Sequence, residues 1–556
     1  MNKNKIRIIP LGGVEEIGRN MTSIEYGDDI IIVDAGLQFP GDDTPGIDYI
    51  LPNSKYLEER KHKIRALVLS HGHLDHIGGI PYLIKRLGNP MIYTNTLTKA
   101  MILKRQEEFP NVPKLRIRET KGNDVIKLSR NITLKFFDIV HTIPDAIGTV
   151  ISTPLGNIIY PGDVKIDRDK DGKPLKMEAY NKLGKEKNLV LLLESTNSEK
   201  PGFSTTEETV SKNLEKIFAE AEGRIIVGTF SSQIERIVRI IKIAERLGRK
   251  VVIDGFSMKT NLEIAEKLNF FKPKKGTIIS VKEIDNHPDN KILALCTGAQ
   301  GEEYAALMRI ASRRHNHIKL HENDTVVLSS SIIPGNEKNI QNLKDNLSRQ
   351  GAKIIHYEVA DIHASGHAYS EELKMLIKAI KPRFFIPVHG HYFMLKTNAN
   401  LAESVGIPKK NIMIPVRNGT IIEVDNMKIQ TLKETAPSNY VMVDGLGVGD
   451  VKEIVLRDRQ MLAQDGIFVI IAVIDTKNGG VIGSPDIISR GFVYLRESQE
   501  LLKSVRQIIR KTVLETTKMH PINIAYVKDQ IKEKIGKFLF QKTKRRPMVL
   551  PVVIEI

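Results

Sequence analysis

The stretch that decides the fold is His71-Gly72-His73-Leu74-Asp75-His76, in which three imidazoles and one carboxylate fall within six residues. The apolar run of residues 64–69 precedes it and has the length of a buried strand. Residues 77–84 follow it and are expected to form a short helix. The cluster is therefore predicted to lie on a loop at the end of a strand, where an open α/β sheet places its site. Imidazoles with a carboxylate suit zinc or manganese, and two ligand sets this close can serve two adjacent ions.

Three further strand-like runs are each followed by a histidine, aspartate or glutamate, the metal-type residues that commonly bind metal ions. They lead to His141 after residues 132–140, to Asp163 after residues 157–160, and to Glu194 after residues 188–193. A lone histidine at a strand end is more often a hydrogen-bonded structural residue, and a histidine-rich loop can simply be solvated. Four successive strands that all end in His, Asp or Glu favour a common metal site over either alternative.

From about residue 204 the pattern changes to helices alternating with continuous apolar strands, which favours a parallel, doubly wound sheet. Metal-type residues then return in the segment 361–367, and the strand 383–388 ends at His389. Histidine clusters thus flank a block that has no cluster of its own. We expect residues 204–361 to be a domain inserted into the metal-site domain.

The strand ends of this block carry small, hydroxyl-rich and glycine-rich loops. They are Ser231-Ser232-Gln233, residues 297–302 and residues 329–336. Such loops can present backbone N–H groups to phosphates, although each one alone is more often only a turn between strand and helix. As a set they indicate a phosphate-binding edge.

Composition bounds the partners and the compartment. The formal net charge of +17 favours a polyanionic partner, through phosphate contacts and counterion release. Cys296 is the single cysteine, so no internal disulfide can form and a reducing compartment is expected. The first residues carry no signal-type apolar segment, and no apolar run has the length of a membrane span. We expect a cytoplasmic protein that does not associate with membranes.

The expected domain limits follow from these patterns. A metal-site domain comprises residues 1–203 and 362–425, an inserted α/β domain residues 204–361, a loop-like, glycine-rich linker residues 426–452, and a small α/β domain residues 453–556.

The constellation resembles a known family. HxHxDH at 71–76, with His141, Asp163 and His389, resembles the ligand motifs of the metallo-β-lactamase fold. The inserted block, Glu194 and His367 resemble the beta-CASP nucleases, and the whole chain is similar to the bacterial ribonuclease J family. Supporting segments are PLGGVEEIGRN (10–20), DAG (34–36), GID (46–48), STN (195–197), CTGAQGE (296–302), SGHA (365–368), PVHG (387–390), DGLGVGD (444–450) and SRGFVY (489–494). The resemblance implies an α/β protein: a metallo-β-lactamase αββα sandwich with an inserted doubly wound beta-CASP domain and a small C-terminal α/β domain.

The chain departs from the family pattern at three positions. Glu194 stands where the family has Asp, Ala364 interrupts a His-Val-Ser-Gly-His run, and His391 stands where the family has Glu. Glu194 keeps a carboxylate. His391 places an imidazole beside the site, which can shift the pH optimum but removes no ligand.

The resemblance also implies the roles of the site residues. His71, His73 and His141 would hold one zinc, Asp75, His76 and His389 the second, and Asp163 would bridge them; Mn²⁺ or Mg²⁺ are the alternatives. Asp75 would also orient or deprotonate the attacking water. His367 would donate a proton to the departing 3′ oxygen or clamp the scissile phosphate, and Glu194 would hold His367 or His389 in position.

The implied function is a ribonuclease with 5′→3′ exonuclease and endonuclease activity on single-stranded RNA, in rRNA processing and mRNA decay. Its products would carry a 5′-phosphate and a 3′-hydroxyl. The residues implied to bind the 5′-monophosphate and nearby backbone are Ser231, Ser232, Gln233, His363, Ala364, Ser365, Gly366 and His367. The family implies homodimers or homotetramers, also with a paralogue. The resemblance also implies that Asp48, Ile50 and Asp444 hold a structural calcium ion. From the sequence it is equally possible that the two aspartates only stabilise turns.

Three rival functions stay open at this point. A small-molecule hydrolase of the same fold is disfavoured by the inserted domain, His367 and the +17 charge. A non-catalytic RNA-binding subunit of a nuclease complex is disfavoured by the intact ligand set. A DNA-directed beta-CASP nuclease is harder to separate, because no residue in the sequence identifies a 2′-hydroxyl contact.

Overall fold

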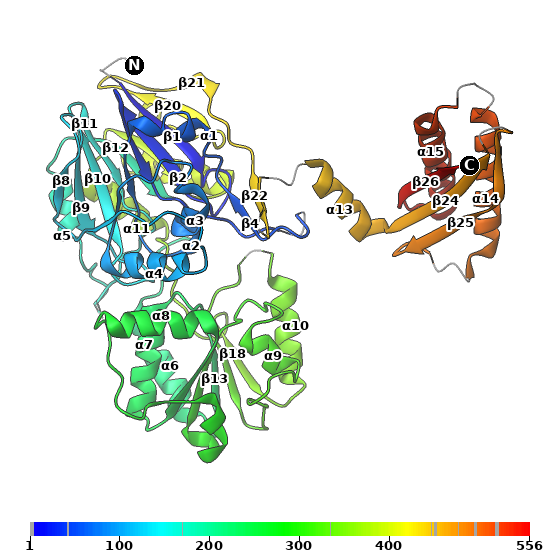
Figure 1. Ribbon diagram of the computed structural model, residues 1–556. Coiled ribbons are helices and arrows are strands. Elements are labelled where there is room, and N and C mark those ends of the chain that lie inside the picture. The colour runs from blue at the N-terminus through cyan, green and yellow to red at the C-terminus, as the bar shows by residue number, and fades with distance from the viewer. Residues whose placement is uncertain are drawn as a thin grey trace. The chain divides into compact units, whose positions relative to one another are not determined.

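The computed structural model of the protein describes residues 5–41, 44–169, 171–333, 335–445, 447–449, 453–475, 478–493, 497–517 and 522–556. The chain divides into two compact units (Figure 1). The first comprises Met1–Gln38 and Ile50–Val441, and the second comprises Phe39–Tyr49 and Met442–Ile556.

The first unit begins with an eight-stranded sheet of order β21-β20-β1-β2-β3-β5-β6-β7. Its strands are β1 (Ile6–Gly12), β2 (Met21–Tyr26), β3 (Asp29–Val33), β5 (Ile64–Val68), β6 (Ile92–Thr94), β7 (Ile117–Glu119), β20 (Thr420–Val424) and β21 (Ile429–Thr435). Strands β3, β5, β6 and β7 run parallel, so the loop after β5 leaves from a parallel edge.

Strand β21 corrects the loop-like reading of residues 426–452. It pairs antiparallel with β20 at the edge of the sheet. Within β21 only Ile429 is buried, and the remaining positions are polar or partly exposed. An edge strand with one buried residue has no alternating hydrophobic pattern, which is why its sequence resembles a loop.

A six-stranded sheet, of order β19-β12-β11-β10-β9-β8, packs against the first. Its strands are β8 (Val125–Lys127), β9 (Thr133–Asp138), β10 (Ile147–Thr153), β11 (Gly156–Tyr160), β12 (Asn188–Glu194) and β19 (Phe384–Val388). Side chains such as Ile8 and Val68 of the first sheet share one buried core with Leu134, Ile158 and Ile386 of the second. The outer face of the second sheet packs against α5 (Glu178–Leu183), α11 (Ser370–Ile380) and α12 (Tyr392–Ser404).

A third sheet lies in the chain between β12 and β19, and all of its pairings are parallel. Its order is β15-β14-β16-β13-β17-β18, with β13 (Ile225–Gly228), β14 (Lys250–Asp254), β15 (Ile278–Ile279), β16 (Ile292–Cys296), β17 (Thr325–Leu328) and β18 (Lys353–His356). Helices α6 (Glu207–Glu220), α7 (Ile234–Arg246) and α8 (Phe256–Lys267) cover one face, and α9 (Ala306–Ala311) and α10 (Glu337–Ser348) the other (Figure 1). This is the doubly wound architecture expected from the alternating pattern.

Short elements complete the first unit. They are α1 (Lys55–Glu58), α2 (Leu74–Ile77), α3 (Ile80–Leu83) and α4 (Thr96–Gln106). The boundary between the two units falls within the strand β4 (Tyr49–Leu51). The short helix expected over residues 77–84 is therefore divided into α2 and α3, and the metal-type residues Asp75 and His76 already belong to α2.

The second unit contains a three-stranded sheet of order β25-β24-β26. The elements of this part of the chain, including those outside the sheet, are β22 (Val441–Asp444), β23 (Gly447–Val448), α13 (Glu453–Asp465), β24 (Ile467–Asp475), β25 (Gly480–Arg490), α14 (Gln499–Thr516), α15 (Ile524–Thr543) and β26 (Met548–Glu555). Alternate residues of β24, from Phe468 to Ile474, pack against α14 and α15. The sequence patterns predicted neither α13 nor β25. Among the described residues, every helix is too short or too polar to cross a membrane.

A substitution at Phe218 tests the packing of α6 on the parallel sheet, because the Phe218 side chain is 0% exposed and belongs to the core that they share. We expect Phe218→Ala to lower the free energy of unfolding by about 3–5 kcal/mol, from lost burial and the cavity left behind. Faster hydrogen exchange of the β13 amides would measure the loss. Phe256→Ala is the matched control, since Phe256 is 77% exposed and a surface change costs within about 0.5 kcal/mol. Equal amide protection in the two variants would contradict this packing.

Candidate functional site

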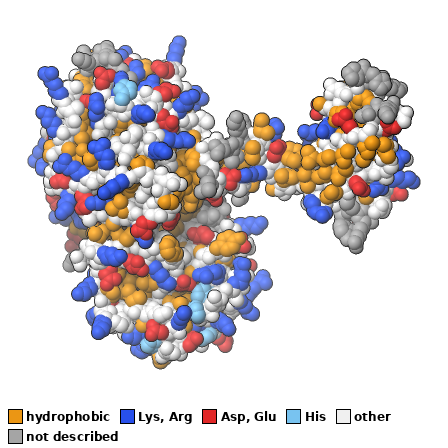
Figure 2. Space-filling view, viewed as in Figure 1, with side chains coloured by type: hydrophobic (Ala, Val, Ile, Leu, Met, Phe, Trp, Pro, Cys, Tyr) orange, Lys and Arg blue, Asp and Glu red, His pale blue; other side chains and the backbone are white. Residues whose placement is uncertain are grey.

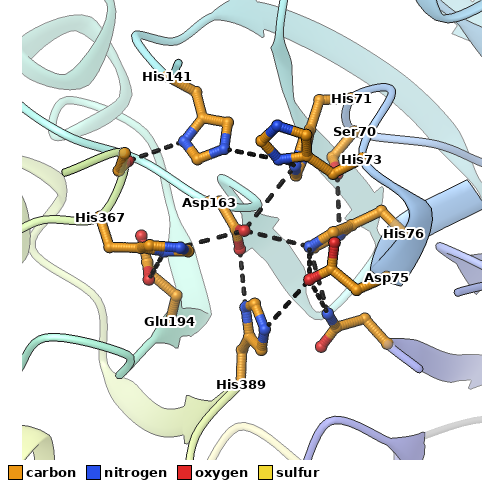
Figure 3. A network of polar contacts seen from close by, with 12 residues as sticks. Ser70, His71, His73, Asp75, His76, His141, Asp163, Glu194, His367 and His389 are labelled. Carbon is orange, nitrogen blue, oxygen red and sulfur yellow. Dashed lines mark hydrogen bonds and ion pairs between the residues drawn. The ribbon is translucent and has the colours of Figure 1, made fainter. Parts of the chain in front are cut away.

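The predicted metal-type residues meet at the carboxyl ends of strands in the two packed sheets (Figure 3). His71 follows β5, His141 follows β9, Asp163 follows β11 and His389 follows β19. The candidate ligand atoms form two groups, and within each group all atoms lie within 4.8 Å of one another. The first group is His71, His73, His141 and Asp163, and the second is Asp75, His76, Asp163 and His389. Asp163 belongs to both groups, so the two candidate ion positions are adjacent.

The carboxylate of Asp163 lies at the centre of these contacts (Figure 3). Its Oδ2 is 3.2 Å from His76 Nε2 and 3.8 Å from His71 Nε2. Its Oδ1 is 2.8 Å from His389 Nδ1. Oδ2 therefore faces a histidine of each ligand group, and Oδ1 faces a second histidine of the second group.

The first group consists of imidazoles that point at one another. His73 Nδ1 lies 3.0 Å from His71 Nε2 and 3.1 Å from His141 Nε2. Burial, followed by the neighbouring imidazoles, lowers the pKa of His71 and His141 well below the usual range. Burial lowers the pKa of His73 to about 4. Neutral imidazoles with converging nitrogens are the form in which histidine binds a metal.

Orphaned donor atoms show that the residues fit a divalent ion. His73 Nε2 and His389 Nε2 are buried and have no hydrogen-bond partner. A buried polar atom without a partner is costly, and an absent ion is a common reason for one. The donor set of imidazole nitrogens and carboxylate oxygens is the one that zinc and manganese accept.

The second group concentrates negative charge around His76. Burial disfavours the charged imidazole, but the carboxylates of Asp163, Asp75 and Asp34 outweigh it and raise the pKa of His76 well above its usual value. The reverse holds for Asp163, whose pKa falls well below its usual value despite burial, because His389 and His76 face it. The environment therefore favours a positive charge at this point.

Asp34 holds His76 in place, a role that was not predicted from the sequence. Its side chain is fully buried, and its Oδ2 accepts hydrogen bonds from His76 Nδ1 at 2.7 Å and from the Tyr160 hydroxyl at 2.7 Å. Its Oδ1 accepts from the backbone N–H of Ser70 at 2.9 Å. His76 Nδ1 is thereby occupied, and Nε2 is directed at Asp163. The available signal was a carboxylate directly after the apolar run 30–33.

Backbone hydrogen bonds hold the hexapeptide 71–76 against Asn20, just before β2, and against the loop after β3. The N–H of Asn20 donates to the carbonyl of Asp75 at 2.9 Å, and the N–H of Ala35 donates to the carbonyl of His76 at 2.8 Å. At Gly36 an added Cβ would lie 1.6 Å from the Asp75 carbonyl oxygen. Only glycine fits such a close approach, so Gly36 helps to set the position of the ligands.

A third group places His367 beside the carboxylate of Asp163. His367 Nδ1 lies 2.6 Å from Glu194 Oε2 and 3.8 Å from Asp163 Oδ2. Burial opposes the charged ring, but Glu194 and then Asp163 raise the pKa of His367 to about 9. The His367 side chain is 24% exposed, whereas that of Glu194 is 2% exposed. A protonated imidazole thus faces the open side of the site.

The segment 363–367 alternates between partly exposed and buried residues, as an extended chain does. His363, Ser365 and His367 are partly exposed, and Ala364 and Gly366 are buried. The Gly366 carbonyl accepts a 2.7 Å hydrogen bond from Nδ1 of His141, so this segment also orients one metal-type histidine.

The loop Ser231-Ser232-Gln233 has fewer side chains available to bind phosphate than the sequence suggested. Ser231 and Ser232 are partly exposed, but Gln233 is buried. Gln233 Oε1 already accepts from Thr229 Oγ1 at 3.1 Å and from Arg236 Nη1 at 2.8 Å. Gln233 therefore stabilises the loop, while the two serines remain accessible.

The residues named for calcium do not form a ligand cluster among the described residues. Asp48 Oδ2 accepts a 2.7 Å hydrogen bond from the backbone N–H of Gly445, and Asp444 is ion-paired with Arg459. The Ile50 carbonyl accepts from the backbone N–H of Gln38 at 2.9 Å. A calcium ion would compete with the Arg459 guanidinium, and calcium binding here stays a prediction.

His391 is exposed and does not belong to any candidate ligand group of the described residues. Its ring is parallel to that of Phe393, with centroids 6.0 Å apart and 7° between the planes. Neither candidate ligand group therefore depends on His391, and its effect on the pH optimum stays a prediction.

Family models match four parts of the chain. The metallo-beta-lactamase superfamily matches residues 15–179, the ribonuclease J beta-CASP domain residues 222–347, the Zn-dependent metallo-hydrolase RNA specificity domain residues 353–415, and the ribonuclease J C-terminal domain residues 454–556. These matches confirm the expected fold class: a metallo-β-lactamase domain with a beta-CASP insert and a ribonuclease J C-terminal domain.

Relatives align along the full chain. Ribonuclease J 1 of Streptococcus pyogenes serotype M3 is 38% identical over 554 residues, covering 100% of this chain and 98% of the relative. Ribonuclease J2 of Bacillus subtilis is 35% identical and ribonuclease J 2 of Staphylococcus aureus (strain MRSA252) 39% identical, each covering 100% of this chain and 99% of the relative. A crystal structure of a protein of unknown function from Enterococcus faecalis V583 shares the fold, with a TM-score of 0.54 and 18% identity, over 77% of this chain and 100% of that one.

Asp34 provides the test of the ligand geometry. We expect Asp34→Asn to weaken zinc binding about 10- to 100-fold, because the His76 ring loses the carboxylate that orients it. Chelator competition followed by metal analysis measures the affinity. Asp124→Asn is the control, since Asp124 is exposed and its side chain accepts only from the backbone N–H of Lys121. Unchanged affinity in Asp34→Asn would show that Asp34 does not support the ligands.

Proposed function

Because the chain belongs to the ribonuclease J family, we propose that it hydrolyses single-stranded RNA with both 5′→3′ exonuclease and endonuclease activity. The products carry a 5′-phosphate and a 3′-hydroxyl, and the activity serves rRNA processing and mRNA decay. The observation that carries the proposal is the complete pair of ligand groups around Asp163, with the His367–Glu194 pair beside them.

The two ligand groups are proposed to hold two divalent ions, zinc first and Mn²⁺ or Mg²⁺ as alternatives. His71, His73 and His141 hold one, Asp75, His76 and His389 the other, and Asp163 bridges them. Two such ions polarise a phosphodiester and lower the pKa of water. Asp34, Asn20 and the loop around Gly36 keep the second ligand group in position.

Side chains of the protein are proposed to orient the attacking water and to donate the proton to the leaving group. Asp75 is the ligand carboxylate with the most exposed side chain, at 30%, and is placed to orient the attacking water. Since the pKa of His367 is about 9, this imidazole carries a proton at neutral pH. It therefore donates to the departing 3′ oxygen, and Glu194 keeps the ring in place through Nδ1.

RNA phosphates are proposed to bind Ser231, Ser232 and the segment 363–367. Gln233 and Gly366 support these contacts through the bonds described above, and the Ala364 carbonyl does so by accepting a 2.9 Å hydrogen bond from Arg236. The partly exposed side chains of this set are hydroxyls and imidazoles, which suit phosphate oxygens. A 5′-monophosphate bound there places the first internucleotide bond near His367, which supports exonuclease action.

The remaining assignments are proposals of the same standing. We propose domain limits of 1–203 with 362–425, 204–361 and 453–556, supported by the separate sheets. Of the predicted linker 426–452, strand β21 pairs with β20 and belongs to the first of these domains. A homodimer or homotetramer, alone or with a paralogue, is supported by the apolar face of β24, β25 and β26, where Ile482 is 47%, Leu550 47% and Ile554 46% exposed (Figure 2). The single cysteine supports a cytoplasmic location.

Substrate comparison tests the activity directly. Wild type and His76→Ala are incubated with 5′-monophosphorylated RNA, 5′-triphosphorylated RNA and matched DNA. We expect mononucleotides from the monophosphorylated RNA and a loss of at least about 100-fold in His76→Ala, since a misplaced ion forfeits several kcal/mol of transition-state stabilisation. His321→Ala, at an exposed histidine, is the control.

Each other outcome rejects a named part of the proposal. Equal rates for wild type and His76→Ala reject the two-ion site. Similar rates on DNA reject the substrate class. RNA binding without cleavage by the wild type indicates a non-catalytic subunit.

The acid role of His367 predicts a pH effect. A general acid acts in its protonated form, so activity falls as pH rises through its pKa. Glu194→Gln removes the nearest charge that raises the His367 pKa, and the alkaline limb of the pH–kcat profile is expected to move to lower pH. Glu220→Gln, on the exposed end of α6, is the control. An unmoved alkaline limb in Glu194→Gln would exclude His367 as the acid.

A further inference from the structure

Arg236 on α7 is a buried hub, 1% exposed, that joins loops of the proposed RNA site. Its guanidinium forms an ion pair with Glu207 at the start of α6. Its other contacts are to Gln233 Oε1 at 2.8 Å, the Ser329 carbonyl at 3.2 Å, His363 Nδ1 at 2.7 Å and the Ala364 carbonyl at 2.9 Å. One side chain thus connects the loop after β13, the loop after β17 and the segment 363–367.

The contact with His363 determines which ring nitrogen carries the proton. A guanidinium has only N–H donors and cannot accept a hydrogen bond. His363 Nδ1 must therefore accept from Arg236, so it carries no proton. Burial, followed by the charge of Arg236, also lowers the pKa of His363 well below its usual value, so the ring is neutral. Its one remaining proton is on Nε2.

The surroundings of His363 favour an anion. Two lysines, Lys165 and Lys200, contribute positive charge near the ring besides Arg236. Lys165 Nζ is buried without a hydrogen-bond partner, although Asp167 lies 3.3 Å away and Glu207 3.8 Å away. His363 shares its face of the extended segment with Ser365 and His367. A hydrogen bond between its ring and the backbone of Ser329 helps to hold the ring there.

We propose that Arg236 is a positioning residue that keeps His363 in the neutral Nε2–H form, so that the ring presents a fixed N–H donor to a phosphate of the RNA. This inference rests on the proposed ribonuclease function. Arg236 itself is too deeply buried to contact RNA. With the proton on Nδ1 instead, the ring would turn a lone pair toward the phosphate oxygens, which repel it.

Two substitutions at His363 separate the nitrogens. In His363→Gln the side-chain amide reaches the place of Nε2 and can donate there, whereas in His363→Asn it reaches only the place of Nδ1. We expect KM for short 5′-monophosphorylated RNA to stay within about threefold in the Gln variant. In the Asn variant KM is expected to rise about 10- to 100-fold, the loss of a hydrogen bond to a charged group, with kcat little changed. Equal KM values in the two variants overturn the proposal.

Arg236→Met tests the positioning directly. Nitrogen NMR of the full-length protein with labelled histidine reports the tautomer, and the His363 signals are identified by their loss in His363→Gln. We expect wild type to show the Nε2–H form alone and Arg236→Met to show a mixture, with a higher KM. Arg239→Met is the matched control, because Arg239 lies on the same helix and pairs with Glu235. An Nδ1–H form in wild type overturns the proposal, whether or not Arg236→Met folds.

A double-mutant cycle completes the test. In the His363→Asn background, Arg236→Met should raise KM no further if the two residues act through one another. An additive loss overturns the positioning role. If the wild type cleaves none of the RNA substrates, the ribonuclease proposal fails, while the tautomer measurement still decides whether Arg236 controls His363.

Discussion

The structure depends on one buried carboxylate, that of Asp163. It belongs to all three ligand groups of the site and contacts His71, His76, His367 and His389. An unpaired carboxylate at 2% exposure would be strongly unfavourable, so the surrounding imidazoles are required for stability as well as for chemistry. The same contacts place two candidate ion positions on either side of one side chain.

The two packed sheets supply those imidazoles because they present their strand ends at a common edge. Strands β5, β9, β11 and β19 are far apart in the chain, yet each continues into a loop that reaches the centre. Asp34, on the loop after β3, then fixes His76, and the close approach at Gly36 fixes the backbone of the hexapeptide. A rigid scaffold of this kind sets ligand geometry more accurately than loops alone.

The inserted domain contributes to the surroundings of the candidate metal site. It lies between β12 and β19, and Glu194 is the last residue of the strand that leads into it. The segment 363–367 leads back from it and brings His367 to Asp163. Arg236 connects that segment to the loop of residues 231–233, so the two loops proposed to bind phosphate are held together by one buried side chain.

The sequence by itself identified the candidate metal ligands and most of the strands that lead to them. His71, His141, Asp163 and His389 were predictable because each follows an apolar run of strand length, and such runs are buried whatever their neighbours. Local pattern failed where burial comes only from distant parts of the chain. Strand β21 has one buried residue, so pairing with β20 makes it a strand although its pattern does not.

Arg236 and Asp34 show the same limit at the site. In sequence, Arg236 is a charged residue on an amphipathic helix and Asp34 is a turn aspartate after a strand. Only the tertiary structure buries both and gives each an imidazole to hold. The reason is physical: residue type and periodicity determine which side chains can bind a metal or a phosphate. The proton positions and orientations that make them do so depend on hydrogen bonds between segments that only the fold brings together.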